Sequence, residues 1–308
     1  MSAGPSSPPP RLRIAVIGSG RVGAVLGAAL MRAGHQVVAA CAVSELSRLR
    51  AEALLPGVPI LDAPRAVEHA DLVLLTVPDR VVGNLVRGLA ATNNVTPGQF
   101  WVHTSGSQGL DVLEPASASG AIALAIHPVM TFTGTSVDLE RLADCPFGVS
   151  ATPEFRPVAE ALVVEMGGDP IWIPSQARPR YHAALSLSSN GLMAIVAASM
   201  AVLNDAGIEH PGRLVEPLLV ASLDNALRLG DAAMTGPVVR GDADTVRMHA
   251  EALAEVSADT AAAYRGIARL ILARARAAGT LGGSLAEEVA SVLGDDRATS
   301  GDPDREGR

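Results

Sequence analysis

The sequence predicts an α/β fold, in which a doubly wound, mostly parallel sheet is followed by an all-helical domain. In the first half of the chain, short apolar runs alternate with helical stretches, which is the pattern of parallel strands joined by crossover helices. A glycine-rich turn links the first apolar run to the first helix. From Ala177 to about Leu293, helical periodicity continues almost throughout. These observations indicate two domains of different class.

The apolar runs of the first half are candidate strands. Those that alternate with helical stretches are Arg13–Ile17, Gln36–Ala42, Leu72–Val77, Phe100–Thr104 and Ala121–Ile126. Two further runs, Pro146–Ser150 and Pro170–Ile173, flank a helix expected over Glu154–Met166 and extend the sheet. In open α/β sheets, ligands bind at the carboxyl ends of the strands. The residues at those ends are therefore the candidates for a functional site.

The glycine-rich turn has the spacing of a dinucleotide-binding loop. Gly18 permits the tight turn after the first strand, Gly20 lets the backbone approach a pyrophosphate, and Gly23 lets the helix pack on the strand. The helix N-terminus offers unpaired N–H groups and a partial positive charge to phosphates. The residues expected to bind the cofactor here are Gly18, Ser19, Gly20, Arg21, Val22 and Gly23, with Val77 and His103 at neighbouring strand ends.

The residues after the second strand favour NADP over NAD. A chain that binds NAD usually has an acidic residue there to hold the ribose 2′-OH, whereas this strand ends at Ala42 and no acid precedes Glu45. Hydroxyl and guanidinium groups, which suit a 2′-phosphate, follow instead. They belong to Ser44, Ser47, Arg48 and Arg50, of which we expect Ser44 and Arg48 to bind the cofactor. The alternative is that the arginines only decorate a solvated helix face.

Composition excludes several classes of protein. A net charge of −8 gives no broad basic surface for nucleic acid. The cysteines Cys41 and Cys145 lack metal-ligand spacing, so no metal site is expected and a reducing cytosol is indicated. The longest apolar run, residues 191–203, is too short to span a bilayer and is expected to be a buried helix. The chain is therefore expected to be cytoplasmic, without a membrane or nucleic-acid partner.

The pattern along the chain gives expected domain boundaries. Residues 1–10 lack the apolar core of a signal peptide and are expected to form a disordered leader. A dinucleotide-binding domain is expected over residues 11–174 and a helical substrate and dimerisation domain over 175–294, with the boundary near Ser175. The charged residues 295–308 are expected to form a disordered tail. The long apolar helices after Ala177 favour an oligomer over a monomer.

Two histidines and a serine stand at strand ends in the first domain. His103 and Ser105 follow one strand, and His127 follows the next. Each histidine could instead be a buried structural residue. Two at adjacent strand ends, one of them followed by a small hydroxyl residue and a glycine, favour a site. Ser105 could then bond to a carboxylate or carbonyl of the substrate.

The second domain adds two groups of polar residues. On its first helix His182, Ser186, Ser189 and Asn190 are expected to share one face, next to Tyr181, and would bind substrate or pack on a neighbouring helix. Further along, Arg240 could clamp a carboxylate, and Asp242 stands where helix capping alone would explain it. His249 is expected two turns further down the same helix.

Taken together, these motifs resemble a bacterial family of Rossmann-like proteins whose helical C-terminal half is a domain of unknown function. The motifs that carry the resemblance are the glycine loop, His103-Thr104-Ser105-Gly106, His127-Pro128, Tyr181-His182, Ser189-Asn190, Thr235-Gly236-Pro237 and Arg240-Gly241-Asp242. The family is similar in plan to pyrroline-5-carboxylate reductase, ketopantoate reductase, prephenate dehydrogenase and 3-hydroxyisobutyrate dehydrogenase. This implies a helical domain of the 6-phosphogluconate dehydrogenase C-terminal type and a homodimer that interlocks through it.

Some members of that family are considered alternative ketopantoate reductases of pantothenate biosynthesis. The resemblance implies NADPH-dependent reduction of a small α-keto acid, with ketopantoate as the best single guess. Typical ketopantoate reductases use a lysine on the first helix of the second domain, but all 24 basic residues here are arginine. His182 is the expected substitute, because an imidazole can donate a proton near neutral pH. The residues expected to assist are Asn190 and Ser105 at the carbonyl and Arg240 at the carboxylate, with Asp242 beside it.

Two other functions remain open on the sequence alone. One is imine or prephenate chemistry on the same scaffold, because arginine recognition of a carboxylate is common to all these substrates. The other is a dinucleotide-sensing protein without turnover, whose helical domain binds a partner. His103, His127 and His249 also remain alternatives to His182 as the proton donor.

Overall fold

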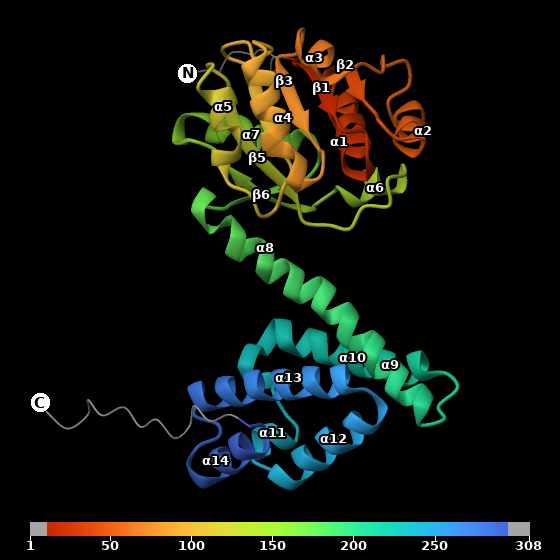
Figure 1. The fold of residues 1–308 in the computed structure, drawn as a ribbon, viewed down its shortest axis with the longest axis vertical. Helices are drawn as coiled ribbons and strands as arrows, with labels where there is room; N and C mark the ends of the chain where they lie inside the picture. Colours follow the sequence, from red (N-terminus) through yellow and green to blue (C-terminus); the bar gives the residue numbers. More distant parts are fainter. Residues whose placement is uncertain (1–10, 295–308) are drawn as a thin grey trace, which may run out of the picture. The chain divides into compact units, whose positions relative to one another are not determined.

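A computed structural model describes residues 11–294 of the chain (Figure 1). The expected leader and tail, residues 1–10 and 295–308, lie outside the described residues. The chain divides into two compact units, one ending at Leu187 and the other beginning at Ser188. This division falls later than the expected boundary near Ser175, because the helix that begins at Arg178 is tied to the first unit by its buried arginine.

The first unit is built on a seven-stranded sheet with the strand order β2-β1-β3-β4-β5-β6-β7. Neighbouring strands are parallel except for β5 and β6, which are antiparallel, so the expected mostly parallel sheet is confirmed. The strands are β1 (Arg13–Ile17), β2 (Gln36–Cys41), β3 (Leu72–Leu75), β4 (Phe100–His103), β5 (Ile122–Pro128), β6 (Pro146–Ser150) and β7 (Asp169–Trp172).

Helices cover both faces of this sheet, as a doubly wound fold requires. In β1, Ile14 and Val16 pack into one apolar core, whereas Ala15 and Ile17 pack into a second core on the opposite face. The first core contains α1 (Arg21–Arg32) and α7 (Arg156–Glu165); the second contains α3 (Ala63–Val67), α4 (Asp79–Ala91) and α5 (Glu114–Ser117). A strand buried on both faces reads as a continuous apolar run rather than as an alternating one.

The edge beyond β2 carries an extra pairing that the sequence does not announce. After α2 (Glu45–Leu54), Ile60 forms an isolated parallel bridge with Ala40 of β2. The chain then returns through α3 to β3, which lies on the other side of β1. Within the described residues, the chain beyond β2 therefore pairs with the sheet through this isolated bridge and forms no further strand there.

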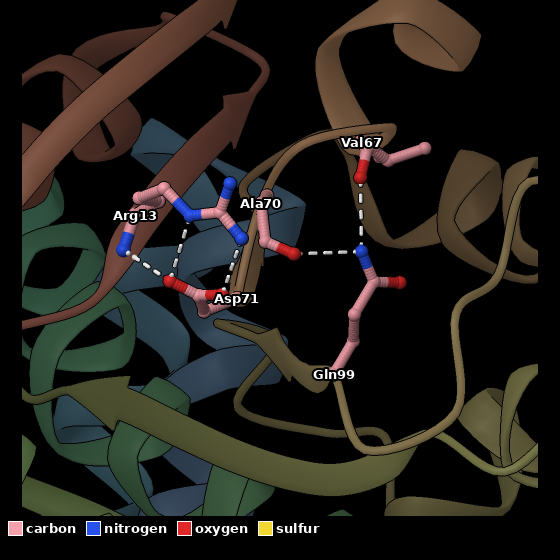
Figure 2. A network of polar contacts seen from close by, with 5 residues as sticks. All are labelled: Arg13, Val67, Ala70, Asp71 and Gln99. Carbon is pink, nitrogen blue, oxygen red and sulfur yellow. Dashed lines mark hydrogen bonds and ion pairs between the residues drawn. The ribbon is translucent and has the colours of Figure 1, made fainter.

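A polar network closes the amino-terminal edge of the sheet, opposite the candidate site (Figure 2). The Arg13 guanidinium donates to both carboxylate oxygens of Asp71, at 3.1 and 2.8 Å. Nearby, the side-chain amide of buried Gln99 donates to the carbonyls of Val67 and Ala70, at 2.9 and 2.7 Å. The Gln99 bonds supply a donor to two carbonyls in the interior, where an unpaired polar group is costly.

We expect Gln99→Ala to lower the free energy of unfolding by about 2–4 kcal/mol, because it removes a donor from the buried carbonyls of Val67 and Ala70 and the acceptor of the Trp101 indole N–H. Urea unfolding followed by tryptophan fluorescence would measure the change, since Trp101 is fully buried next to this network. The matched control is Gln36→Ala, whose side chain is exposed at the start of β2. Equal midpoints for the two variants would contradict the assignment.

Three short elements lie between strands of the sheet: η1 (Leu110–Leu113), α6 (Val137–Arg141) and η2 (Pro153–Phe155). After β7 the chain continues through η3 (Ser175–Ala177), α8 (Arg178–Ser186) and a single π-helical turn, η4 (Leu187–Gly191). The π-helical turn interrupts the 3.6-residue periodicity. That His182 and Asn190 share one helical face stays a prediction, since Asn190 lies inside this turn.

The second unit is all-helical, as expected. Its elements are α9 (Leu192–Asp205), α10 (Pro211–Leu229), η5 (Gly230–Ala233), α11 (Pro237–Arg240), α12 (Ala243–Val256), α13 (Ala258–Ala277) and α14 (Gly283–Val292). Its core is formed by apolar residues of α11 to α14, among them Val238, Val246, Leu272 and Val289.

Helices α9 and α10 have no buried residue in the single chain. The expectation of a buried helix over residues 191–203 is thus wrong for one copy of the chain. The apolar run is also part of a longer helical stretch, residues 175–205, because α8, η4 and α9 are continuous. Among the described residues, this stretch alone is long and apolar enough to cross a membrane, by length and composition only, which is weak evidence for a span.

Candidate functional site

The glycine loop forms the first part of the site, at the carboxyl end of β1. Gly18 has a φ of +106°, and its carbonyl accepts a 2.6 Å hydrogen bond from the Thr76 hydroxyl. A Cβ on Gly23 would lie 2.2 Å from both the Gly18 carbonyl oxygen and that hydroxyl, so only glycine fits there. A Cβ on Gly20 would meet nothing within 4 Å. The backbone at Gly20 therefore faces open space, while the other two glycines make the loop tight.

This loop fits a bound phosphate group. Gly20 is the N-cap of α1 and supplies no side-chain hydrogen bond to the first turn of the helix. The Ser19 side chain is fully buried, and its hydroxyl has no hydrogen-bond partner in the described structure. Val77 packs against Gly18 from the end of β3. Uncapped N–H groups together with a partnerless buried hydroxyl suit an anionic ligand at a helix N-terminus.

The structure places the other two cofactor candidates at the start of α2. Ser44 is the N-cap of this helix, and its side-chain oxygen accepts a hydrogen bond from the Ser47 amide at 3.2 Å. Arg48 lies one turn into the helix and is exposed. Capping accounts for Ser44 without a ligand. Contact of either residue with a cofactor stays a prediction.

A cluster of rings lies beyond β4 and β5. His127, at the end of β5, shares a 2.9 Å hydrogen bond between its Nδ1 and the hydroxyl of Tyr181 on α8. The His182 ring stands edge-on to His127, with 5.9 Å between the ring centroids. Gly106 fills the remaining space, because a Cβ there would come within 2.8 Å of His127 Nε2 and 2.4 Å of the His182 ring. The fold thus brings His127 and His182 together.

Burial sets the protonation of this cluster. Burial, aided by the charge of Arg178, lowers the pKa of His127 to about 4. Burial also raises the pKa of Tyr181. Near neutral pH, His127 is therefore a neutral imidazole and Tyr181 a neutral phenol, and a neutral hydrogen bond joins the two side chains. His127 is poorly suited to donate a proton to substrate at that pH.

A fully buried arginine lies under the ring cluster. Arg178 begins α8, and its guanidinium donates to three backbone carbonyls and one hydroxyl. The carbonyls belong to Ser105 at 2.8 Å, Ala125 at 3.0 Å and Gly148 at 2.7 Å, and the hydroxyl to Ser150 at 2.8 Å. Arg178 therefore fixes α8, with Tyr181 and His182, to the loop after β4 and to strands β5 and β6.

Ser105 is held from two sides. Its carbonyl accepts from Arg178, and its hydroxyl donates to Asp79 Oδ2 at 2.6 Å. The hydroxyl oxygen in turn accepts from the amide of Gln108 at 3.1 Å. The Ser105 proton is thus used by a carboxylate, so the expected donation to a substrate carbonyl requires that this bond be exchanged.

His103 is more deeply buried than we expect for a residue that contacts a cofactor. Its side chain is fully buried, and because a carbonyl can only accept, its Nε2 carries the proton and donates to Gly109 at 3.0 Å. Burial and the charge of Arg178 lower the pKa of His103 to about 4. Nδ1 has no partner in the described residues. His103 is neutral and cannot act as a proton donor near neutral pH.

The remaining predicted residues belong to the second unit. Asn190 lies in η4, and Arg240 is exposed at the end of α11. Asp242 is the N-cap of α12, where the hydroxyl and amide of Thr245 hold the pKa of its carboxyl below the usual value. Helix capping explains Asp242 fully, and its catalytic role stays a prediction.

The second unit contains a ring pair of its own. His249 Nδ1 lies 3.1 Å from the hydroxyl of Tyr264. The chain has two tyrosines, and each shares a hydrogen bond with a histidine Nδ1. Tyr264 lies on α13, whereas His249 lies on α12, so this pair could not be predicted from the sequence of either helix alone.

Two residues of the site escape sequence reasoning. Asp79 and Arg178 each act through partners that are distant in the chain; the Arg178–Ser105 pair is separated by 73 residues. The signal available for Asp79 was its place directly after the β3 end, in Val77-Pro78-Asp79. Arg178 gave no signal, because an arginine near a proline at a helix start reads as a solvated residue.

Comparison with known proteins agrees with this architecture. A family model described as a Rossmann-like domain matches residues 3–128, and one described as a domain of unknown function, DUF2520, matches residues 145–271. A search of curated proteins returns no match.

Several solved structures share the fold. Protein BF3122 from Bacteroides fragilis, assigned as an NADP oxidoreductase, has a TM-score of 0.68 at 21% identity, over 85% of this chain and 98% of that one. Protein TM1727 from Thermotoga maritima has a TM-score of 0.64 at 23% identity, over 86% and 99%. The reductive aminase of Aspergillus terreus, in complex with NADPH and ethyl-5-oxohexanoate, has a TM-score of 0.63 at 17% identity, over 92% and 99%.

At these identities the structural likeness establishes the fold. The two family models show which domain family each half of the chain matches. The first covers the glycine loop and the strand ends that carry His103 and His127, and the second covers α8 and most of the helical unit. The chain belongs to the family of Rossmann-like proteins whose C-terminal half is a DUF2520 domain.

Proposed function

We propose that this protein is an NADPH-dependent reductase of a small carbonyl or imine compound. The observation that carries the proposal is the ring cluster of His127, Tyr181 and His182, which lies beyond β4 and β5 in the same unit as the glycine loop. Ligands of open α/β sheets bind at this end of the strands. The partnerless Ser19 hydroxyl and the uncapped start of α1 suit a dinucleotide phosphate.

In this proposal the chain's residues orient the substrate and supply a proton. Bound NADPH supplies the hydride. His182 donates the proton to the oxygen or nitrogen that becomes anionic, because His127 and His103 are held neutral. The Tyr181–His127 hydrogen bond keeps the neighbouring ring in a fixed orientation. Arg178 holds α8 in place and so acts as a positioning residue.

The first substrate candidate is an α-keto acid, with ketopantoate as the compound to test. Its support is the family resemblance, in which some members are considered ketopantoate reductases. A polar, cationic site for a carboxylate is provided by arginines alone, since the chain lacks lysine. Contact of Arg240 and Asn190 with the substrate stays a prediction.

The second candidate is an imine, and structural likeness supports it. The imine reductase from Pseudomonas sp. has a TM-score of 0.62 at 18% identity, over 91% of this chain and 98% of that one. An imidazole such as that of His182 can donate to a nitrogen as well as to an oxygen. The same proton donor would therefore serve both substrates.

The experiment that tests the proposal is the loss of NADPH absorbance with purified protein, with NADH in parallel. Ketopantoate, a cyclic imine and prephenate are offered as substrates, prephenate with the oxidised cofactors. Turnover that prefers NADPH supports the proposal and selects the substrate class. Saturable NADPH binding without turnover of any of these compounds would favour a dinucleotide sensor instead.

We further propose that two copies of the chain associate through α9 and α10. Both helices expose apolar side chains, including Leu192, Met193, Ile195, Leu214, Leu218 and Leu223. Because α9 and α10 contact each other, these exposed apolar side chains gather on two neighbouring helices, as at a protein–protein interface. A second copy presents the same apolar residues, so the pair can bury them symmetrically.

We expect a homodimer in sedimentation at micromolar concentration and a shift toward monomer in the Leu218→Glu, Leu223→Glu double variant. Two carboxylates in an apolar interface would be desolvated without partners. The control is Val164→Glu, which adds a charge at an exposed apolar position of α7 in the first unit. A monomeric wild-type protein would contradict the proposal.

A further inference from the structure

The loop after β5 is fixed by a buried carboxylate. Asp138 on α6 is fully buried and accepts hydrogen bonds from the amides of Thr133 and Gly134, at 2.8 and 2.7 Å. It also accepts from the Thr133 hydroxyl at 3.0 Å. A carboxylate bound by several N–H and O–H donors holds its loop in one conformation. The Thr133–Gly134 turn is therefore a fixed part of the structure.

Two arginines from different helices converge on this turn. Gly134 has a φ of +81°. A Cβ placed on it would lie 2.7 Å from Arg50 Nε and 3.0 Å from Arg21 Cγ. Arg21 is the first residue of α1, directly after the glycine loop, and Arg50 lies in the second half of α2. The turn thus brings the side chains of Arg21 and Arg50 close together.

The charges of this pair are not compensated by the protein. The side chains of Arg21 and Arg50 have no hydrogen bond or ion pair with any other described residue. Like charges held beside one turn repel each other. An anion between them removes the repulsion and gains charge-assisted hydrogen bonds. Because Arg21 follows the glycine loop and its partnerless Ser19 hydroxyl, the chemistry that fits is a phosphate group.

We propose that Arg21 and Arg50, held against the Thr133–Gly134 turn, bind a phosphate of the dinucleotide as a two-arginine clamp. The inference rests on the proposed function, because it assigns part of the cofactor site. It differs from the sequence expectation in choosing Arg50 over Arg48, which is exposed, and in adding the turn that follows β5. The phosphate is either the 2′-phosphate or the pyrophosphate, and the two are separable by experiment.

The test compares NADPH and NADH binding by isothermal titration calorimetry in Arg50→Gln, Arg21→Gln and wild-type protein. We expect each substitution to weaken NADPH binding by about 10- to 100-fold. If NADH binding is unchanged in Arg50→Gln, the clamp holds the 2′-phosphate. If both cofactors weaken alike, it holds the pyrophosphate. Both results support the clamp, and the variants should fold because the two side chains lie at the surface or only half-buried.

The matched control is Arg32→Gln, which removes the same charge from the exposed carboxyl end of α1. Asp138→Asn is a second probe, because it weakens the bonds to the turn without touching either arginine; we expect a smaller loss of NADPH affinity. Wild-type affinity in both arginine variants would overturn the clamp alone. No binding of either cofactor by wild-type protein would instead overturn the proposed function, and the clamp with it.

Discussion

Replacing His182 by alanine should lower kcat by about 100-fold or more and leave the dissociation constant for NADPH within about twofold of wild type. The reason is that His182 lies beside His127 in the ring cluster, and the pKa of His127 is lowered to about 4, so His127 is not available as the donor near neutral pH. The measurement is steady-state turnover of whichever substrate proves active, together with calorimetric binding of NADPH.

The control for this experiment is His69→Ala, since His69 is exposed near the amino-terminal edge of β3. Tyr181→Phe is a useful companion, because it removes the hydroxyl that bonds to His127 and keeps the ring. A large loss of kcat in Tyr181→Phe with full activity in His182→Ala would transfer the role of proton donor to the tyrosine. Equal losses of turnover and NADPH affinity in His182→Ala would remove His182 from the mechanism.

Replacing Arg178 by methionine should lower the free energy of unfolding of the first unit by about 3–5 kcal/mol. Methionine fills a similar volume but donates no hydrogen bond. The carbonyls of Ser105, Ala125 and Gly148 would remain buried without the donor that Arg178 provides. Hydrogen exchange at the amides of β5 and β6 would report the change locally, without assuming that the two units unfold together.

The control is Arg180→Met, an exposed arginine on the same helix. Arg178→Lys should recover only part of the stability, because an ammonium has three donors and cannot reach all four acceptors. If the amides of β5 and β6 exchange at the same rates in the Arg178→Met and Arg180→Met variants, the hydrogen bonds of Arg178 contribute little to stability.

Arg178→Met should also change the protonation equilibrium of His127. Arg178 is the second cause, after burial, of the lowered pKa of His127. A histidine whose folded pKa lies below its unfolded value makes the folded state less stable as pH falls from about 6.5 toward 4, because the unfolded chain then binds more protons. Wild-type stability should decline over that range. The pKa of His127, followed by NMR, should rise in Arg178→Met.

Much of the fold is visible in the sequence, because its determinants are local. The apolar runs at Arg13–Ile17 and Pro146–Ser150 coincide with β1 and β6, and the other expected strands match to within a few residues. Strands buried on both faces must be apolar throughout, which makes them readable one at a time. The glycine loop is equally local: the positive φ at Gly18 and the tight packing at Gly23 impose glycine wherever the neighbours come from.

The candidate site was visible only in part. The strand-end rule placed His103 and His127 at the functional edge, but it did not reveal that His103 is fully enclosed. Nor did it show that the Ser105 proton is bonded to Asp79. Both facts depend on residues that approach from other elements. Helical periodicity likewise placed His182 and Asn190 on one face, but it did not reveal the π-helical turn that contains Asn190.

The sequence by itself therefore determined the order of strands and helices, the phosphate-binding loop, and which polar residues end the strands. Only the tertiary structure decided which of those residues meet, what charge they carry, and that α9 and α10 have no core of their own. The physical reason is distance along the chain. Periodicity and glycine spacing act within a few residues, whereas Arg178 finds its carbonyl partners 30, 53 and 73 residues away, and such pairings exist only once the chain has folded.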